Sequence, residues 1–200
     1  MKPHFALPAV LLALLTTAAF AQKDASTADA PKSNPLQSAT LQSSAPQSEA
    51  QKSFATIKSL AGEWEGPVTV ADMPQMSGAK MHLSMRVTSR GNTLVHEFQE
   101  AGTPLDPAKY DHPVTMLYVD SDQLTLVHYC DAGNRPRKTG KKSPDGKTLN
   151  FQLKDISGST EEHMHHSVFN LVDDTHHTED WTFMMNDKPI HAHFDLHRVN

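Results

Sequence analysis

From residue 81 to the end of the chain, apolar side chains recur at every second position and turn residues interrupt the pattern at short intervals. Met81, Leu83, Met85 and Val87, for example, alternate with polar neighbours. A period of two is typical of a β-strand that buries one face and exposes the other. This pattern therefore predicts a β domain made of short strands.

The pattern predicts about nine strands, near 64–70, 81–87, 94–98, 114–119, 123–130, 148–153, 163–172, 177–185 and 190–199. Their connections leave no room for crossover helices, so neighbouring strands are expected to be antiparallel. We predict an all-β, antiparallel up-and-down barrel, because closure removes the exposed edges of a meander. A β-sandwich is the alternative, although its Greek-key returns usually need longer connections.

One short helix is expected before the first strand. From Ser53 onward, Phe54, Ile57 and Leu60 recur at helical spacing, and Gly62 provides a stop signal. We therefore place the folded domain at residues 53–200. The preceding segment 22–52 is rich in Ser, Gln, Ala, Pro and Thr and has few large apolar residues, so we expect a disordered polar linker.

The first residues resemble a secretory signal peptide. Lys2 precedes an apolar run that is too short for a comfortable bilayer span and ends in the small-x-small sequence Ala19-Phe20-Ala21. We expect residues 1–21 to be removed by cleavage after Ala21, and a periplasmic or secreted location. No later stretch is apolar enough to predict a membrane span.

Composition limits the choice of partners and crosslinks. Cys130 is the single cysteine, so no internal disulfide can form and a buried core must supply the stability. The formal net charge of −5 disfavours nucleic-acid binding, which usually requires a basic face. The sequence fixes neither a cofactor nor the oligomeric state.

The beginning and the end of the domain resemble the calycin (lipocalin-like) architecture. Gly62-Glu63-Trp64 follows the predicted helix, as a Gly-x-Trp element does on the first strand of that architecture, and Arg198 lies on the last predicted strand. The resemblance implies that Arg198 packs across the Trp64 ring and closes one end of the barrel.

Further segments are similar to a family of exported bacterial lipocalin-like proteins of unestablished function. They are 128–130, 133–137, 163–165 and 179–182. The opening of the domain is also similar to that of nitrobindin-like haem proteins, but no sequence feature assigns a haem-ligating histidine. The resemblance supports a fold rather than an activity.

Eight of the thirteen histidines follow residue 160, which raises the question of a metal site. His163 and His165 lie two apart on a predicted strand, so both could reach one zinc or copper ion, or a haem. His128 or Cys130, with Glu161 or Glu162, are candidate further ligands. His191, His193 and His197 alternate with apolar residues of the last strand and are therefore expected to face solvent. The cupin pattern is disfavoured, because no glutamate follows His-x-His at the required distance.

A ligand site inside the barrel is the main functional expectation. Its candidate contacts are His128, Cys130, Asn134, Arg137, His165 and Trp181. Tyr118 and Met116 are candidate apolar walls. A Cys130–His128 nucleophilic pair is disfavoured, because residues two apart on a strand point in parallel and no orienting acid is evident. No motif specifies a reaction, so the sequence leaves catalytic activity open and favours a non-catalytic role.

The one basic concentration, from Arg135 to Lys147, is expected to form a solvated loop. The alternative is a loop that folds over the barrel mouth, where Arg137 and Asn134 would clamp a carboxylate. Three functions remain open. They are non-catalytic binding of a small, partly apolar ligand in the barrel, metal or haem binding near His163 and His165, and a structural envelope role with a filled barrel.

Overall fold

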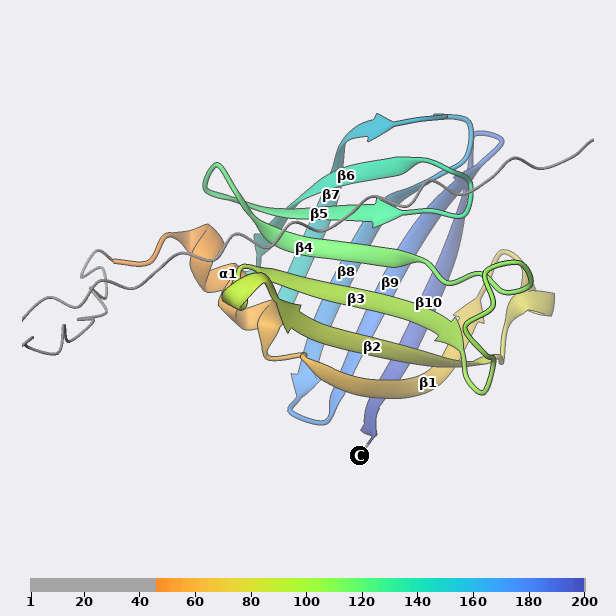
Figure 1. Ribbon diagram of the computed structural model, residues 1–200, viewed down its shortest axis with the longest axis horizontal. Helices are drawn as coiled ribbons and strands as arrows, with labels where there is room; N and C mark the ends of the chain where they lie inside the picture. The colour runs from red at the N-terminus through yellow and green to blue at the C-terminus, as the bar shows by residue number, and fades with distance from the viewer. Residues whose placement is uncertain (1–45, 200) are drawn as a thin grey trace, which may run out of the picture. The chain divides into compact units, whose positions relative to one another are not determined.

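A computed structural model describes residues 46–199 of the protein. One helix, two short 3-10 helices and ten strands are present in this part of the chain (Figure 1). Their bounds are α1 Glu49–Lys58, β1 Gly62–Val70, η1 Pro74–Met76, β2 Lys80–Thr88, η2 Ser89–Gly91, β3 Thr93–Glu100, β4 Val114–Asp120, β5 Gln123–Tyr129, β6 Arg135–Lys142, β7 Thr148–Ser157, β8 His163–Asp173, β9 His176–Met185 and β10 Lys188–Val199. The predicted signal peptide and most of the predicted linker lie outside these residues.

The ten strands form one closed antiparallel barrel. Each strand pairs with its sequence neighbours, and β1 pairs with β10 to close the sheet. The predicted all-β barrel with one short helix is thereby confirmed, with ten strands rather than nine. The additional strand is β6, a segment that was predicted to be a loop. No helix within residues 46–199 is long and apolar enough to cross a bilayer.

Helix α1 begins at Glu49 rather than at Ser53. Ser48 caps it, because its hydroxyl accepts a hydrogen bond from the backbone N–H of Gln51 and the Gln51 side chain accepts one from the backbone N–H of Ser48. This capping box satisfies two of the backbone donors that a helix start leaves free. Phe54 and Ile57 on α1 are buried in the core.

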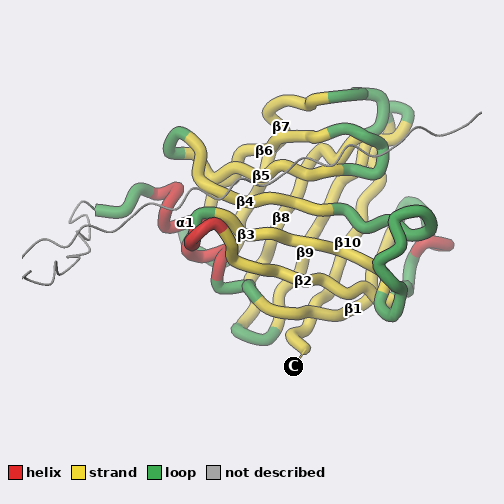
Figure 2. Tube along the Cα trace, viewed as in Figure 1, coloured by secondary structure: helices red, strands yellow, loops and turns green. Residues whose placement is uncertain are grey.

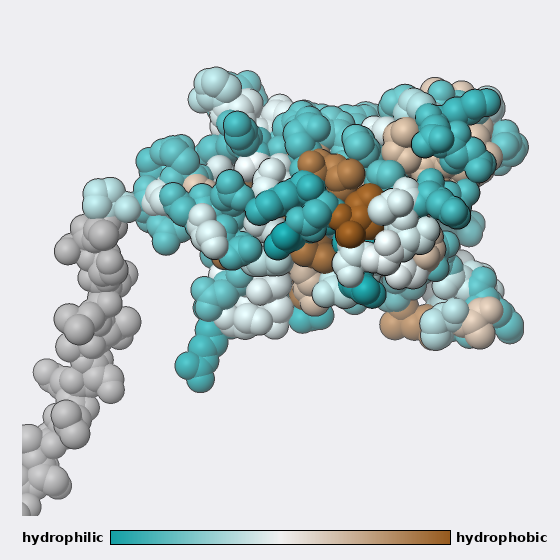
Figure 3. Space-filling view, turned by 90° about the horizontal axis from the view of Figure 1, so that it is seen from above, coloured by the Kyte–Doolittle hydropathy of each residue, from teal (hydrophilic) through white to brown (hydrophobic). Residues whose placement is uncertain are grey.

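The two ends of the barrel differ. Helix α1 lies at one end, whereas η1 and the long connection 101–113 between β3 and β4 lie at the other (Figures 1 and 2). The interior at the α1 end is filled by large side chains that are almost completely buried, among them Trp64, Leu83, Leu117, Leu126, Phe151 and Phe169. Most of the face shown in Figure 3 is hydrophilic, with one small hydrophobic area near its centre and further hydrophobic residues toward the right.

Trp64 and Arg198 lie together at the α1 end. The Arg198 guanidinium is 4.1 Å from the centre of the Trp64 ring, the arrangement that the calycin resemblance implies. It also donates hydrogen bonds to the backbone carbonyls of Ser59, Ala61 and Asp174. Gly62 has a φ of +144°, and a Cβ there would collide with this guanidinium. The glycine of Gly-x-Trp therefore makes room for the arginine.

Candidate functional site

A cavity of about 440 Å³ lies inside the barrel at the end that carries η1 and the 101–113 connection. Its walls are mainly apolar side chains from β1, β2, β3, β8 and β10, including Val68, Met81, Phe98, Met164 and Phe194. Met76 of η1 and residues of the 101–113 connection form its rim. The lining thus comes from strands far apart in the sequence, which only barrel closure brings together.

Polar residues on three neighbouring strands line one side of this cavity. His96 on β3 is opposite Thr115 on β4, and Thr115 is opposite His128 on β5. All three side chains are buried. The Thr115 hydroxyl lies 2.9 Å from Nδ1 of His128, at hydrogen-bond distance.

His128 is a neutral imidazole at ordinary pH. Burial, together with the nearby charges of Lys138 and His96, lowers the pKa of His128 to about 3. Thr115 engages Nδ1, so Nε2 is the ring nitrogen left to meet a ligand. His128 can therefore offer one hydrogen bond at the cavity wall without adding charge.

Behind this wall, Glu179 on β9 is completely buried and accepts three hydrogen bonds. They come from Nε2 of His96 at 3.0 Å, Nε2 of His177 at 3.1 Å and Nε1 of Trp181 at 2.8 Å. Burial alone would raise the pKa of Glu179, but the attraction of His96 and the hydrogen bonds from both histidines outweigh it and lower the pKa to about 2. Glu179 is thus a buried carboxylate held by donors.

Lys138 on β6 is the second charged group inside the barrel. Its side chain has no exposed area, its Nζ donates a hydrogen bond of 2.6 Å to Ser167, and it lies 4.6 Å from the centre of the Trp181 ring. Burial lowers the pKa of Lys138 to about 7. Trp181 therefore touches the cavity, the Glu179 cluster and Lys138 at once.

These groups can orient a ligand but are poorly arranged for covalent chemistry. The Glu179 carboxylate is saturated by donors, and the Lys138 amine lies beyond the Trp181 ring and does not line the cavity. Nδ1 of His96 and Nδ1 of His177 are buried without a hydrogen-bond partner among the described residues. In both histidines the other ring nitrogen, Nε2, is hydrogen-bonded to Glu179. Their role is therefore to hold the carboxylate.

Two of the predicted ligand contacts, His128 and Trp181, line this cavity. Cys130 lies just beyond the end of β5, where its thiol donates to Asp131 at 3.3 Å and borders an open surface depression formed with residues 107–113. Burial, followed by the adjacent Asp131, raises the pKa of Cys130 to about 11. The thiol therefore carries little thiolate at neutral pH.

Asn134 and Arg137 have contacts away from the cavity. The Asn134 amide donates to the backbone carbonyls of Ser159 and Glu162, and so fastens the β7–β8 connection. Arg137 is on the outer face of β6, where it pairs with Asp155 on β7. Neither Asn134 nor Arg137 lines the cavity, because β6 is a paired strand rather than a loop at the barrel mouth.

Tyr118 and Met116 also lie outside the cavity. The inner face of β4 carries Thr115 and Leu117, so the alternating residues Met116 and Tyr118 point outward. The predicted apolar walls are provided instead by Phe98, Met164 and Phe194.

The His163–His165 pair is brought together on β8, with 3.2 Å between Nε2 of His163 and Nδ1 of His165. The register of β8 against β9 shifts between Met164 and His166, so the strand bulges at His165. Neither histidine lines the cavity. Within the described chain, no third histidine, cysteine or carboxylate approaches the two closely enough to complete a ligand set. Metal or haem binding there stays a prediction.

Six residues of this region were not among the site residues predicted from the sequence: His96, Thr115, Lys138, Ser167, His177 and Glu179. One signal was available on β9, where His177, Glu179 and Trp181 occupy alternate positions and hence one face. Polar residues at alternate positions are normally assigned to solvent, and only the closed barrel shows that this face is the inner one. No comparable sequence pattern marks the buried polar residues on the other strands, which are His96 on β3, Thr115 on β4, Lys138 on β6 and Ser167 on β8.

No protein-family model matches the chain, and no curated protein matches its sequence. Among solved structures, Rv2717c from M. tuberculosis is similar, with 15% sequence identity and a TM-score of 0.53 over 74% of this chain and 98% of that chain. A protein of unknown function from the DUF3598 family of Nostoc punctiforme PCC 73102 has 9% identity and a TM-score of 0.48. The matched region includes 72% of this chain and 49%, about half, of that protein.

The similarity to Rv2717c concerns the fold alone, since the identity is low. It agrees with the closed antiparallel sheet and the single helix of this chain. The described part of the protein is thus an all-β, closed antiparallel barrel of ten strands with one short helix.

Proposed function

We propose that the protein binds a small, partly apolar ligand inside the barrel and does not convert it. The observation that carries this proposal is the cavity of about 440 Å³ with apolar walls and one polar side. Sites for small molecules commonly combine a mainly apolar lining with a few fixed polar groups. The volume equals that of roughly 15 water molecules at about 30 Å³ each, which limits the ligand to a small molecule.

The polar side favours a ligand with one hydrogen-bonding group. His128 is neutral and has Nε2 free of Thr115, so it can meet a hydroxyl, carbonyl or amine of the ligand. Burial of the apolar remainder against Phe98, Met164 and Phe194 would supply most of the affinity.

The rim favours an uncharged ligand over an anion. Glu100 and Asp111 both border the cavity. Burial and the neighbouring Asp131 raise the pKa of Asp111, and the Glu100 side chain is exposed to solvent at the rim. An anionic ligand, such as a carboxylate or a sulfonate, would be repelled by negative charge at this rim.

The other functions have weaker support. A purely structural barrel would be filled throughout, whereas this barrel is filled at the α1 end and hollow at the other. Metal or haem binding at His163 and His165 lacks a third nearby ligand in the described residues. A periplasmic or secreted site of action rests on the sequence of residues 1–21 alone.

The test uses two fluorescent probes, the neutral N-phenylnaphthylamine and the anionic anilinonaphthalene sulfonate. Trp181 lines the cavity and Trp64 does not, so energy transfer from tryptophan to a bound probe reports occupancy. We expect the full chain to bind the neutral probe at one site and the anionic probe more weakly.

Matched variants on β10 locate that binding. Ala192 lines the cavity, whereas the next residue, His193, faces solvent. Ala192→Phe should abolish probe binding by filling the cavity, and His193→Phe should leave it intact, with both variants folded by circular dichroism. Failure of the wild-type protein to bind the neutral probe, or equal binding by Ala192→Phe, would contradict the proposal.

A further inference from the structure

The outer face of β9 and β10 carries a cluster of two histidines and one aspartate. His176 on β9 is the cross-strand partner of His197 on β10, and Asp195 lies two residues before His197 on the same outer face. We propose that His176, Asp195 and His197 bind a zinc ion. This site is separate from the barrel cavity and does not depend on the proposed ligand.

The ligand atoms converge. Nε2 of His176 lies 2.6 Å from Oδ1 of Asp195, and Nε2 of His197 lies 3.5 Å from the same oxygen. One nitrogen of each histidine and one carboxylate oxygen all lie within 4.8 Å of one another. Zn–N and Zn–O bonds of about 2.0–2.1 Å at tetrahedral angles separate neighbouring ligand atoms by about 3.3 Å. Small side-chain movements are thus enough to place one ion among the three.

The backbone holds the two imidazoles side by side. Their rings are stacked, with centroids 4.3 Å apart and planes inclined by 17°, because directly paired cross-strand residues are close neighbours. To bind a common ion, the rings rotate slightly so that both Nε2 lone pairs point to one position. The third ligand comes from the same strand as His197, so barrel folding itself assembles the donor set.

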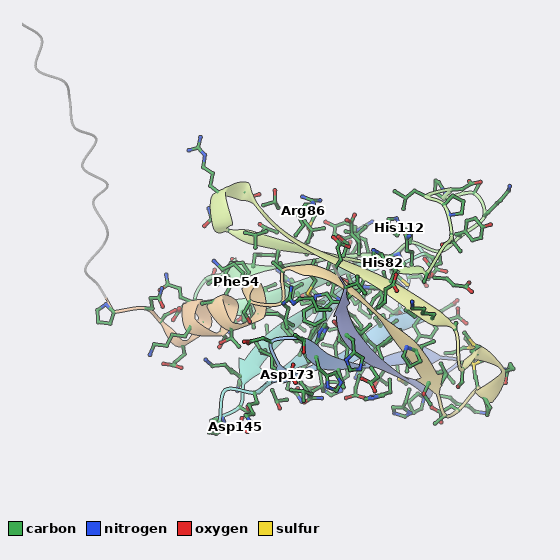
Figure 4. The ribbon with its side chains drawn as sticks, turned by 90° about the horizontal axis from the view of Figure 1, so that it is seen from below. Phe54, His82, Arg86, His112, Asp145 and Asp173 are labelled. Atoms are coloured by element: carbon green, nitrogen blue, oxygen red, sulfur yellow. The ribbon has the colours of Figure 1, made fainter. Side chains whose placement is uncertain are left out.

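The surroundings favour a cation with an open coordination position. Asp173, at the end of β8 next to the β8–β9 turn (Figure 4), is the cross-strand partner of His176 and adds negative charge there. Its carboxylate accepts the backbone N–H of Thr175 at 2.7 Å, which fixes the turn before His176. His197 is exposed and the other two ligands are half-buried, so a water molecule can occupy the fourth position.

Other surface histidines have a different arrangement. His191 pairs with Asp72 and His193 with Asp180, each through a single imidazole. Each is an exposed contact between one imidazole and one carboxylate, and such surface pairs contribute little. Among the residues that the structure describes, the two imidazoles and one carboxylate of the His176 cluster form the one group of this kind within 4.8 Å. Imidazole and carboxylate together suit zinc.

The experiment is titration of the untagged full chain with zinc chloride by calorimetry, together with the visible absorption of bound Co²⁺ as a measure of coordination geometry. We expect one tight equivalent of zinc. His176→Ala and His197→Ala should each weaken it at least about tenfold, since even a hydrogen-bond partner of a metal ligand is commonly worth that much. His191→Ala is the matched control, because His191 is an exposed β10 histidine outside the cluster, and it should keep wild-type affinity.

The outcomes separate this site from other histidines. Absence of a tight equivalent in the wild-type protein, or unchanged affinity in His176→Ala and His197→Ala, would overturn the proposal. Equal weakening by His191→Ala would indicate diffuse surface binding and would also overturn it. Loss of the equivalent in a His163→Ala, His165→Ala double variant, with His176→Ala unaffected, would move the site to β8. All variants alter partly or fully exposed side chains, so thermal unfolding should remain near that of the wild type.

Discussion

The inner face of the barrel contains two charged residues that are wholly buried, Lys138 and Glu179. They are held differently. Glu179 accepts hydrogen bonds from His96, His177 and Trp181, whereas Lys138 has one hydroxyl, that of Ser167, and the Trp181 ring. A buried ammonium with so few acceptors favours its neutral form, which is why its pKa falls to about 7.

Stability is therefore expected to depend on pH through Lys138. Between the folded pKa of about 7 and the ordinary value of 10.5, the unfolded chain holds a proton that the folded chain has lost. The free energy of unfolding should rise with pH across this window and fall as pH returns toward 7, by about 1.4 kcal/mol for each unit crossed.

Urea unfolding at about pH 7 and about pH 9.5 measures this dependence. Lys138→Met should remove most of the rise, because the variant has no proton to lose at this position. Lys141→Met, on the exposed face of the same strand, is the control and should keep the rise. An equal rise in wild type and Lys138→Met would show that other groups cause it.

At the scale of elements, β6 is the strand that sequence patterning missed. Its inner positions are occupied by Pro136, Lys138 and Gly140, none of which is a typical buried strand residue. Lys138 is tolerated at an inner position of the barrel because its Nζ donates a hydrogen bond to Ser167 and contacts the Trp181 ring. Gly140 leaves no cavity in the core, because the Phe151 ring occupies the space where a side chain would lie.

Gly140→Ala should destabilise the barrel by about 1–3 kcal/mol through overpacking. A Cβ at residue 140 would lie 2.5 Å from Cε1 of Phe151 and 2.9 Å from Cδ2 of Leu124, both in the tightly packed core. Urea unfolding measures the loss, and Lys141→Ala, exposed on the same strand, should change stability little. A Gly140→Ala protein as stable as wild type would mean that Phe151 can move aside.

At the scale of the whole molecule, closure depends on the pairing of β1 with β10, the first and last strands of the barrel. Trp64 and Arg198 are cross-strand partners within this pairing. The guanidinium also connects the end of α1, the start of β1 and the β8–β9 turn through three backbone carbonyls. One side chain thus ties together parts of the chain that lie far apart in sequence.

Arg198→Met should lower the free energy of unfolding by about 2 kcal/mol or more, because it removes charge-assisted hydrogen bonds and the cation–π contact but keeps an apolar stem. Arg86 is a matched control, since it is exposed on β2 and points away from the barrel (Figure 4). Arg86→Met should be nearly neutral in the same urea titration. Equal effects of the two substitutions would contradict a closing role for Arg198.

The amino-acid sequence by itself determined the strand period, the turns, the helix and the outward direction of His191, His193 and His197. These properties are local, because alternation and turn chemistry act within a few residues. The tertiary structure alone decided that β6 is a strand, that the polar face of β9 points inward, and that His96 and Thr115 border the same cavity as His128 and Trp181. The physical reason is that a buried lysine or glutamate is stable only beside its particular partners, and here those partners come from other strands that meet when the barrel closes.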